Sequence, residues 1–337
     1  MIYSREVLRR LAAIPPKFAG KRILVLGDLM LDQFIRGRVS RLSPEAPVPV
    51  VQVSQEAHAP GGAGNVCSNL RALGAQVSVF GVLGEDLAGQ NLLSDLQKRG
   101  IDVSGLLSSP SRRTTQKCRV VAEHQQVVRF DRETVGGLAA GDASELLRRL
   151  KAAVGEAQGL VISDYGKGVV TSAVVQAALR LAHRTRLPVL VDPKVEHFKR
   201  YRGVDCITPN LQEAWGGMRL HPSSEEDAIR SLGRKILAAL RVRSVLITRG
   251  EKGMTLFQAR GPLVHIPTQA KEVYDVTGAG DTVVSVMALS LACQAGLADS
   301  AALSNVAAGI VVGKLGTATV SAAEIETALR EMGGRRA

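Results

Sequence analysis

The chain has 337 residues, enough for one large α/β domain or two smaller ones, and 45% of them are hydrophobic, as in globular proteins. Aromatic residues make up only 3%, and the net charge of +12 comes without a long Lys/Arg run, so we expect no nucleic acid as a partner. The basic balance is explained either by a solvated surface or by a field that attracts an anionic substrate.

The cysteines and the apolar segments indicate a cytoplasmic protein that does not contact a membrane. Cys67, Cys118, Cys206 and Cys293 form no C-x-x-C pair and have no zinc-like spacing, so we expect reduced thiols. The N-terminus lacks the apolar core of a signal peptide. The longest apolar segment, 283–298, is interrupted by polar residues and is too short for a membrane span.

Short apolar runs recur along the chain, each closed by Gly, Asp or Pro. In order they are RILVLGD (22–28), QVSVFGVLG (76–84), GLVISDYG (159–166), LPVLVDPK (187–194), CITPN (206–210), SVLITRG (244–250) and GMTLFQA (253–259). Helical periodicity is found at 64–73, 86–99, 142–155, 171–185 and 223–240, and again near 279–296, 299–313 and 322–332. This alternation predicts an α/β fold with a central, mostly parallel sheet and helices on both of its faces.

Two segments depart from this rhythm. Residues 46–57 and 114–133 alternate apolar and polar side chains, as strands with one solvated face do. We therefore expect a small antiparallel lid beside the main sheet, with lid strands at approximately 37–57 and 114–133. Because neither a repeat nor a linker interrupts the chain, residues 1–337 are expected to form a single domain into which the lid is inserted.

The turn after the first predicted strand reads GDLMLD and contains Asp28 and Asp32. A dinucleotide-binding protein would have G-x-G-x-x-G here, and no P-loop motif occurs anywhere in the chain. Two carboxylates would repel a pyrophosphate but suit the hydroxyl groups of a polyol. Each of them is explained equally well as a turn or cap residue.

The segment PGGAGNV places Gly61, Gly62 and Asn65 at the start of a predicted helix. The glycines would let a small ligand approach the backbone closely, and the Asn65 amide can both donate and accept hydrogen bonds. Tight packing of the backbone under the sheet explains the glycines equally well.

The octet DVTGAGDT (275–282) precedes a long apolar run. Gly278, Ala279 and Gly280 would expose N–H groups at a helix N-terminus, where negative charge on a transferring phosphoryl group is stabilised. Asp281 would then take the proton of an attacking hydroxyl. A lone Asp here would be read as a helix cap, but a cap does not require the paired glycines.

These motifs resemble the signatures of the ribokinase-like (PfkB) carbohydrate kinases. Further segments, among them SRLSPEAPVPVV, SDYGKGVVT, TPNLQE and VVGKLGTATVS, are similar to the D-glycero-β-D-manno-heptose 7-phosphate kinases, over roughly residues 20–325. The resemblance implies a ribokinase-like fold, use of ATP and Mg²⁺, and transfer of the γ-phosphoryl group to the anomeric hydroxyl of heptose 7-phosphate. The product would serve ADP-heptose and lipopolysaccharide inner-core synthesis. It also implies a homodimer through the lid, since lidded relatives often dimerise in that way.

The resemblance further assigns roles to individual residues. Asp281 matches the catalytic base and 278–280 the anion hole. The positions that match the nucleotide side are Asn210, Leu211, Gln212, Glu213, Thr248, Gly250, Gly253, Asn305 and Gly309, with Glu213 meeting Mg²⁺ through water. The positions that match sugar contacts are Asp28, Asp32, Gly61, Gly62 and Asn65.

Several cations are candidates for holding a phosphate that the sugar already bears. Lys117, Arg119 and Arg129 have the same parity in the second lid segment and could face one side of it. Lys167 and Lys194 are further candidates. The other explanation of the lid cations is an exposed basic strand face.

The sequence departs from the family pattern at Val276, where Thr is usual, and at AEHQQ in the lid, where a basic residue and Asn are commoner. A kinase for fructose 1-phosphate or tagatose 6-phosphate therefore stays open, as does a non-catalytic sugar or nucleotide sensor on the same fold. Some relatives have a fused nucleotidyltransferase domain. Since this sequence ends at Ala337, we expect another protein to perform the adenylylation.

Overall fold

The computed structural model describes residues 3–123, 125–270 and 272–334, and within these ranges thirteen strands form two separate sheets. The larger sheet has the order β13-β12-β11-β10-β9-β8-β1-β4-β5. Its strands are β1 (Arg22–Gly27), β4 (Gln76–Gly84), β5 (Asp102–Ser109), β8 (Gly159–Ser163), β9 (Val189–Asp192), β10 (Cys206–Ile207), β11 (Ser244–Thr248), β12 (Met254–Gln258) and β13 (Val264–Ile266). All pairings from β11 to β5 are parallel, and β12 and β13 add an antiparallel edge. The predicted mostly parallel sheet is confirmed.

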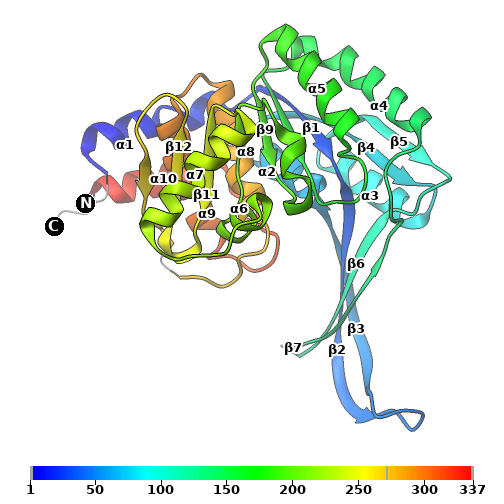
Figure 1. Ribbon diagram of the computed structural model, residues 1–337. Coiled ribbons are helices and arrows are strands. Elements are labelled where there is room, and N and C mark those ends of the chain that lie inside the picture. The colour runs from blue at the N-terminus through cyan, green and yellow to red at the C-terminus, as the bar shows by residue number, and fades with distance from the viewer. Residues whose placement is uncertain (1–2, 124, 271, 335–337) are drawn as a thin grey trace.

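The strands are apolar throughout because both faces of this sheet are buried. On β1, Ile23 and Val25 belong to one core, whereas Leu24 and Leu26 belong to the other. The first core packs against α1 (Arg5–Ala12), α2 (Ala63–Ala72), α3 (Leu87–Lys98), α8 (Ala279–Ala292), α9 (Leu297–Val311) and α10 (Ala322–Gly334). The second packs against α4 (Ala140–Ala153), α5 (Ser172–Thr185), α6 (Leu211–Met218) and α7 (Glu226–Leu240). Helices therefore cover both faces, as predicted (Figure 1).

Some short elements are absent from the predictions. The helices α1 and α6 have only eight residues each, which is short for a periodic pattern, and α6 also contains two glycines. The strand β5 lies at the edge of the sheet and begins with exposed and half-buried positions, unlike the apolar central strands. Short 3₁₀ segments complete the chain at Pro15–Lys17, Val154–Glu156, Val195–Tyr201 and Gly250–Lys252.

The smaller sheet, which we call the lid, has the order β3-β2-β6-β7. Its strands are β2 (Leu29–Leu42), β3 (Pro49–Gly62), β6 (Thr115–Ala122) and β7 (Gln125–Arg132). In Figure 1 the β2–β3 hairpin extends from the body of the molecule as a long arm.

The lid consists of two antiparallel hairpins joined by a parallel pairing between β2 and β6. The separate small sheet is confirmed. The parallel join was not predicted, because alternation alone does not give the direction of a neighbouring strand. The β2 strand also begins well before the predicted boundary at 37.

Of the predicted segment 114–133, His124 lies outside the described residues, as do residues 1, 2, 271 and 335–337 of the predicted single domain. That one domain spans the whole chain stays a prediction. No helix in the described ranges is both long enough and apolar enough to cross a membrane.

Candidate active site

The candidate site lies where the central parallel strands end. The strand β1 ends at Gly27 and β8 at Ser163, and each is followed directly by a buried aspartate, Asp28 and Asp164. The carboxyl ends of parallel strands meet at one edge of the sheet, which is where ligands bind in open α/β folds. Asp281, in the first turn of α8, lies at the same edge, because it accepts a hydrogen bond from Tyr165, the residue after Asp164. Burial and the nearby carboxylate of Asp281 also raise the pKa of Asp192, at the end of β9.

Asp281 is 4% exposed and has a hydrogen-bond donor on each carboxylate oxygen. The amide of Asn65 donates to one oxygen at 2.6 Å, and the hydroxyl of Tyr165 donates to the other at 3.0 Å. Burial raises the pKa of Asp281 to about 6, while these two hydrogen bonds partly oppose the rise. Asp281 is therefore ionised at neutral pH and more basic than an ordinary aspartate, as a general base requires.

The glycine turn in front of Asp281 has two different glycines. Gly278 has φ +81°, and a Cβ there would lie 2.8 Å from the Asn65 amide nitrogen, so this position needs glycine for conformation and space. A Cβ on Gly280 would meet nothing within 4 Å. The fold therefore does not require glycine at 280, and the open space above it is available to a ligand.

The three amides predicted to form the anion hole are not equivalent. The N–H of Ala279 donates to the Val276 carbonyl at 3.2 Å, because the turn into α8 uses it. Within the described ranges, no hydrogen bond is formed by the N–H groups of Gly278, Gly280 or Asp281. The expected hole over 278–280 is corrected accordingly: Ala279 is occupied, and Asp281 offers an additional free N–H.

Asp28 has a different environment from the one expected of a sugar contact. Its side chain is fully buried, and its two oxygens accept the N–H groups of Tyr165, Lys167 and Val169, each at 2.9 Å. Burial raises the pKa of Asp28, and these three bonds oppose the rise. The geometry gives Asp28 the task of holding the loop after β8, and its contact with a sugar stays a prediction.

Asp32 and the glycines of PGGAGNV form one group. The Asp32 carboxylate accepts a hydrogen bond from Arg119 at 2.6 Å, and its other oxygen would lie 2.2 Å from a Cβ on Gly61. Gly62 has φ +57°, and a Cβ there would contact the ring of Tyr165. Gly61 thus leaves room for Asp32, Gly62 leaves room for the Asp28 carbonyl, from which a Cβ would lie 2.5 Å, and Asn65 contacts the base. Close backbone packing, the alternative explanation, applies to both glycines.

The lid pairing places the predicted cations on one face. Register pairs Asp32 with Lys117, and Arg119 with Arg129, so these side chains share the face opposite to that of Gln33. Arg119 is bound to Asp32, and Arg129 donates two hydrogen bonds to Asp131.

The remaining candidate cations differ in their neighbours. Lys167 forms an ion pair with Glu133. Lys194 lies 3.9 Å from Glu196. Burial raises the pKa of Glu213 and the charge of Lys194 partly opposes the rise, so Lys194 lies toward the residues expected to bind nucleotide.

The residues expected on the nucleotide side fall into two groups, the first at the start of α6. Asn210 caps this helix, with its side chain accepting the Glu213 N–H at 2.9 Å and the Glu213 carboxylate accepting the Asn210 N–H at 2.8 Å. Leu211 and Gln212 form the first turn of the helix. Thr248 at the end of β11 bridges to Asn210.

The second group surrounds the loop at 266–270. Buried Asn305 donates to the Pro267 carbonyl at 2.8 Å, and a Cβ on Gly309 would lie 3.1 Å from the Ala270 nitrogen. A Cβ on Gly253 would lie 2.1 Å from the Ile266 carbonyl oxygen, whereas Gly250 faces open space. Asn305, Gly253 and Gly309 therefore shape this loop.

The residues present fit a magnesium ion that arrives with a nucleotide. Within the described part of the chain, no cluster of three or more His, Cys, Asp or Glu side chains is placed to hold a metal. Glu213 uses one oxygen in its helix cap, and the other is free for a metal-bound water. Mg²⁺ commonly keeps several waters and binds through one or two carboxylates and the substrate phosphates.

Two residues of the site were not predicted, Tyr165 and Asp192. Asp192 ends β9 in VDPK, and Tyr165 is the second residue after β8 in SDYGKG, and in both segments only the lysine was predicted to contact a ligand. A polar residue at the carboxyl end of a parallel strand was the signal that could have identified them.

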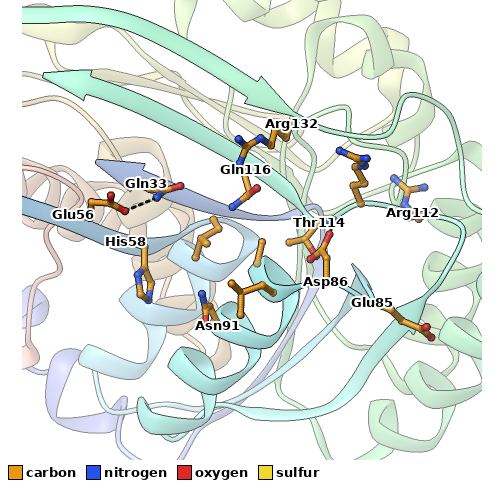
Figure 2. Close-up of a pocket in the computed structure, with 14 residues that line it drawn as sticks. Gln33, Glu56, His58, Glu85, Asp86, Asn91, Arg112, Thr114, Gln116 and Arg132 are labelled. Atoms are coloured by element: carbon orange, nitrogen blue, oxygen red, sulfur yellow. Dashed lines mark hydrogen bonds between the residues drawn. The ribbon is translucent and has the colours of Figure 1, made fainter. Parts of the chain in front are cut away.

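A cavity of about 860 Å³ lies behind the lid, away from Asp281. Figure 2 shows it between the lid residues Gln33, Gln116 and Arg132 and Asn91 of α3. Since Gln33 adjoins Asp32 in the strand, this cavity is on the opposite face of the lid from the predicted cations. Arg132, which lines this cavity, can therefore serve as a control for variants of the cations on the other face.

Comparison with known proteins identifies a family and a fold. The family model described as pfkB family carbohydrate kinase matches residues 21–324. The "Bifunctional protein HldE" of Citrifermentans bemidjiense is 48% identical over 306 residues, which cover 90% of this chain and 62% of that protein. The protein of the same name from Hahella chejuensis is 44% identical, covering 95% of this chain and 65% of its own length. This chain thus spans less than two thirds of these relatives.

Solved structures share the fold at low identity. The ribokinase of Arabidopsis thaliana, complexed with ribose and ATP, has a TM-score of 0.73 at 17% identity, over 92% of this chain and 99% of that one. The phosphofructokinase-2 of Escherichia coli, in complex with substrates and products, has a TM-score of 0.77 at 19% identity, over 94% of this chain and 100% of that one. The fold is ribokinase-like, as predicted, and the chain belongs to the pfkB family of carbohydrate kinases.

Proposed function

We propose that the chain is an ATP-dependent kinase that phosphorylates the anomeric hydroxyl of D-glycero-D-manno-heptose 7-phosphate. The product would be heptose 1,7-bisphosphate for ADP-heptose and lipopolysaccharide inner-core synthesis. The observation on which the proposal mainly rests is the buried, basic Asp281 beside unpaired N–H groups of a helix start. The heptose assignment is supported by the segments that resemble heptose 7-phosphate kinases and by the identity to the HldE proteins.

In the proposed reaction the anomeric O–H bond breaks, its proton goes to Asp281, and the oxygen bonds to the γ-phosphorus as ADP leaves. The free N–H groups of Gly278 and Gly280 are directed at the charge on the transferring phosphoryl group. Mg²⁺, held with the phosphates and through water by Glu213, would neutralise part of that charge. The lid excludes water and so limits hydrolysis of ATP.

A panel of phosphosugars tests this function. We expect ADP release to be at least about 100-fold more efficient, in kcat/KM, with heptose 7-phosphate than with fructose 1-phosphate, tagatose 6-phosphate or unphosphorylated heptose. A preference for another phosphosugar would mean that this sugar, and not heptose 7-phosphate, is the substrate. Bound ATP without transfer to any sugar would favour the non-catalytic sensor.

The lid cations give a prediction about substrate affinity. Replacing Arg129 with Gln should raise the KM for the phosphosugar about tenfold, because a charge-assisted bond to the substrate phosphate is lost, while kcat changes little. The matched control is Arg132→Gln, which removes the same charge from the other face of β7, beside the cavity of Figure 2. Equal effects of the two variants would indicate a general charge effect and no phosphate contact at Arg129.

We further propose a cytoplasmic homodimer that associates through the lid. The lid exposes apolar side chains on strands that form its two edges, including Val53 on β3 and Val127, Val128 and Phe130 on β7. Sedimentation should give about twice the chain mass at micromolar concentration, and replacing Val128 and Phe130 with Ser should lower it. A purely monomeric wild-type protein would contradict this proposal.

A further inference from the structure

Tyr165 has contacts both through its backbone and through its ring. Its N–H donates to the buried Asp28 carboxylate at 2.9 Å, together with the N–H groups of Lys167 and Val169. Its ring packs above Gly62, where a Cβ would lie 3.4 Å from a ring carbon. The backbone of Tyr165 is therefore held by Asp28, and its ring lies beside the backbone of Gly62.

The hydroxyl of Tyr165 reaches the candidate base. It donates to one oxygen of Asp281 at 3.0 Å, while Asn65 donates to the other oxygen at 2.6 Å. Burial and the charge of Asp281 raise the pKa of Tyr165 well above its ordinary value, so the hydroxyl stays protonated and remains a donor. Each carboxylate oxygen keeps a lone pair for an incoming hydroxyl, and the plane of the carboxylate is set by the two donors.

The face of the same ring contacts the lid. The Lys117 ammonium lies 5.4 Å from the centre of the Tyr165 ring, within the range of a cation–π contact. Arg119, Arg129 and Lys167 each pair with a carboxylate. Among these four cations Lys117 has no such ion pair within the described residues.

We infer that Tyr165 is a positioning residue, which orients the Asp281 carboxylate through its hydroxyl and links that carboxylate to Lys117 of the lid through its ring. The inference rests on the proposed role of Asp281 as the base. It assigns to Tyr165 a role in the reaction without contact with the reacting atoms.

The charged groups around Asp281 determine its response to pH. The carboxylate of Asp32, near the start of β2, adds to the rise that burial causes in the pKa of Asp281, and the charge of Lys117 opposes it. The Asp192 carboxylate on β9 interacts with Asp281, and the buried thiol of Cys67 on α2 lies near it. Besides these groups, the neutral side chains of Tyr165 and Asn65 stabilise the ionised form of Asp281 by direct hydrogen bonds.

Tyr165→Phe tests the inference, because it keeps the ring and removes only the donor. In wild type, kcat should fall as the pH drops through about 6, since Asp281 must be ionised. In the variant this acid limb should move about one pH unit higher, because the ionised base loses a hydrogen bond. The plateau kcat should fall about tenfold from poorer orientation, with KM nearly unchanged. Lys117→Met should move the limb in the same direction by less.

Tyr201→Phe is the matched control. The Tyr201 hydroxyl is also buried and donates to a carboxylate, that of Asp164 at 2.7 Å, but it does not contact Asp281. This variant should leave the acid limb in place. An equal shift in both variants would mean that loss of any buried tyrosine hydroxyl changes the profile, and the positioning role would be rejected.

A titration without turnover separates this inference from the proposed function. Aspartate labelled with ¹³C at the carboxyl group gives a resonance for Asp281 that is identified by its loss in Asp281→Asn, and its pKa should rise in Tyr165→Phe whichever sugar is the substrate. An inactive Asp281→Asn with an unshifted resonance in Tyr165→Phe would overturn the inference and leave the base in place. An active Asp281→Asn would overturn the proposed function itself.

Discussion

Replacing Asp281 with Asn should lower kcat by about 10²–10⁴, while ATP still binds with nearly unchanged affinity. The amide keeps the size of the carboxylate, but its NH₂ group replaces one of the two oxygens that accept from Asn65 and Tyr165, and it does not accept the proton of the attacking hydroxyl. Because Asp281 is 4% exposed, bulk water has little access to this position and would not replace it as the base. The measurement is ADP release under saturating substrates, with nucleotide affinity from calorimetry.

The control for this prediction is Asp299→Asn. Asp299 also lies in the first turn of a helix, α9, where it pairs with Arg10 at 3.1 Å, so its loss removes a favourable helix-dipole contact without touching the site. It should cost at most about 1 kcal/mol of stability and leave kcat unchanged. Near-wild-type turnover of Asp281→Asn would show that another group accepts the proton.

Replacing Asp28 with Ala should destabilise the protein by about 3–5 kcal/mol, because three buried N–H groups lose their acceptor at once. The loop that they belong to contains Tyr165, so kcat should fall as well. Urea denaturation of the wild type and the variant measures the change in the free energy of unfolding.

Asp102→Ala is the comparison for this loss. Within the described residues, the exposed Asp102 carboxylate accepts hydrogen bonds from the Ser104 N–H at 3.0 Å and the Ser78 hydroxyl at 2.8 Å. Both donors can form hydrogen bonds with water when the carboxylate is removed. We expect a change of about 1 kcal/mol or less. Similar losses in the two variants would contradict the role given to Asp28.

The fold was predictable where the sequence pattern has a direct physical cause. Strands such as β1 and β8 are buried on both faces and therefore consist of consecutive apolar residues, which are visible without a structure. The lid strands alternate apolar and polar residues in sequence, but the structure exposes both faces of β7 and of the middle of β3. The parallel pairing of β2 with β6 joins residues about 85 positions apart, as in Met30 with Thr115, and no local pattern reports it.

The candidate site was predictable in its chemistry and less so in its contacts. The glycine turn and Asp281 stand together in one octet, and parity alone places Lys117, Arg119 and Arg129 on one face. The donors to Asp281, however, come from Asn65 and Tyr165, which are 216 and 116 positions away. Asp28 shows the same limit, since its partners begin 137 positions later, so its support of the loop after β8 could not be predicted from the turn GDLMLD.

The attachment of the lid has a mechanical consequence. A single residue, Asp28, separates β1 from β2, and β3 passes into α2 without an intervening residue. These two junctions are tied together, because the Ala63 N–H donates to the Asp28 carbonyl at 3.0 Å. The irregular pairings that allow bending lie further out, at Arg36/Gly37 and between Val39 and Arg41. The lid is thus fixed to the main sheet at the end that contains Asp32, and it can bend only nearer its tip. Bending of the tip would let a substrate enter or leave while the fixed end keeps its alignment.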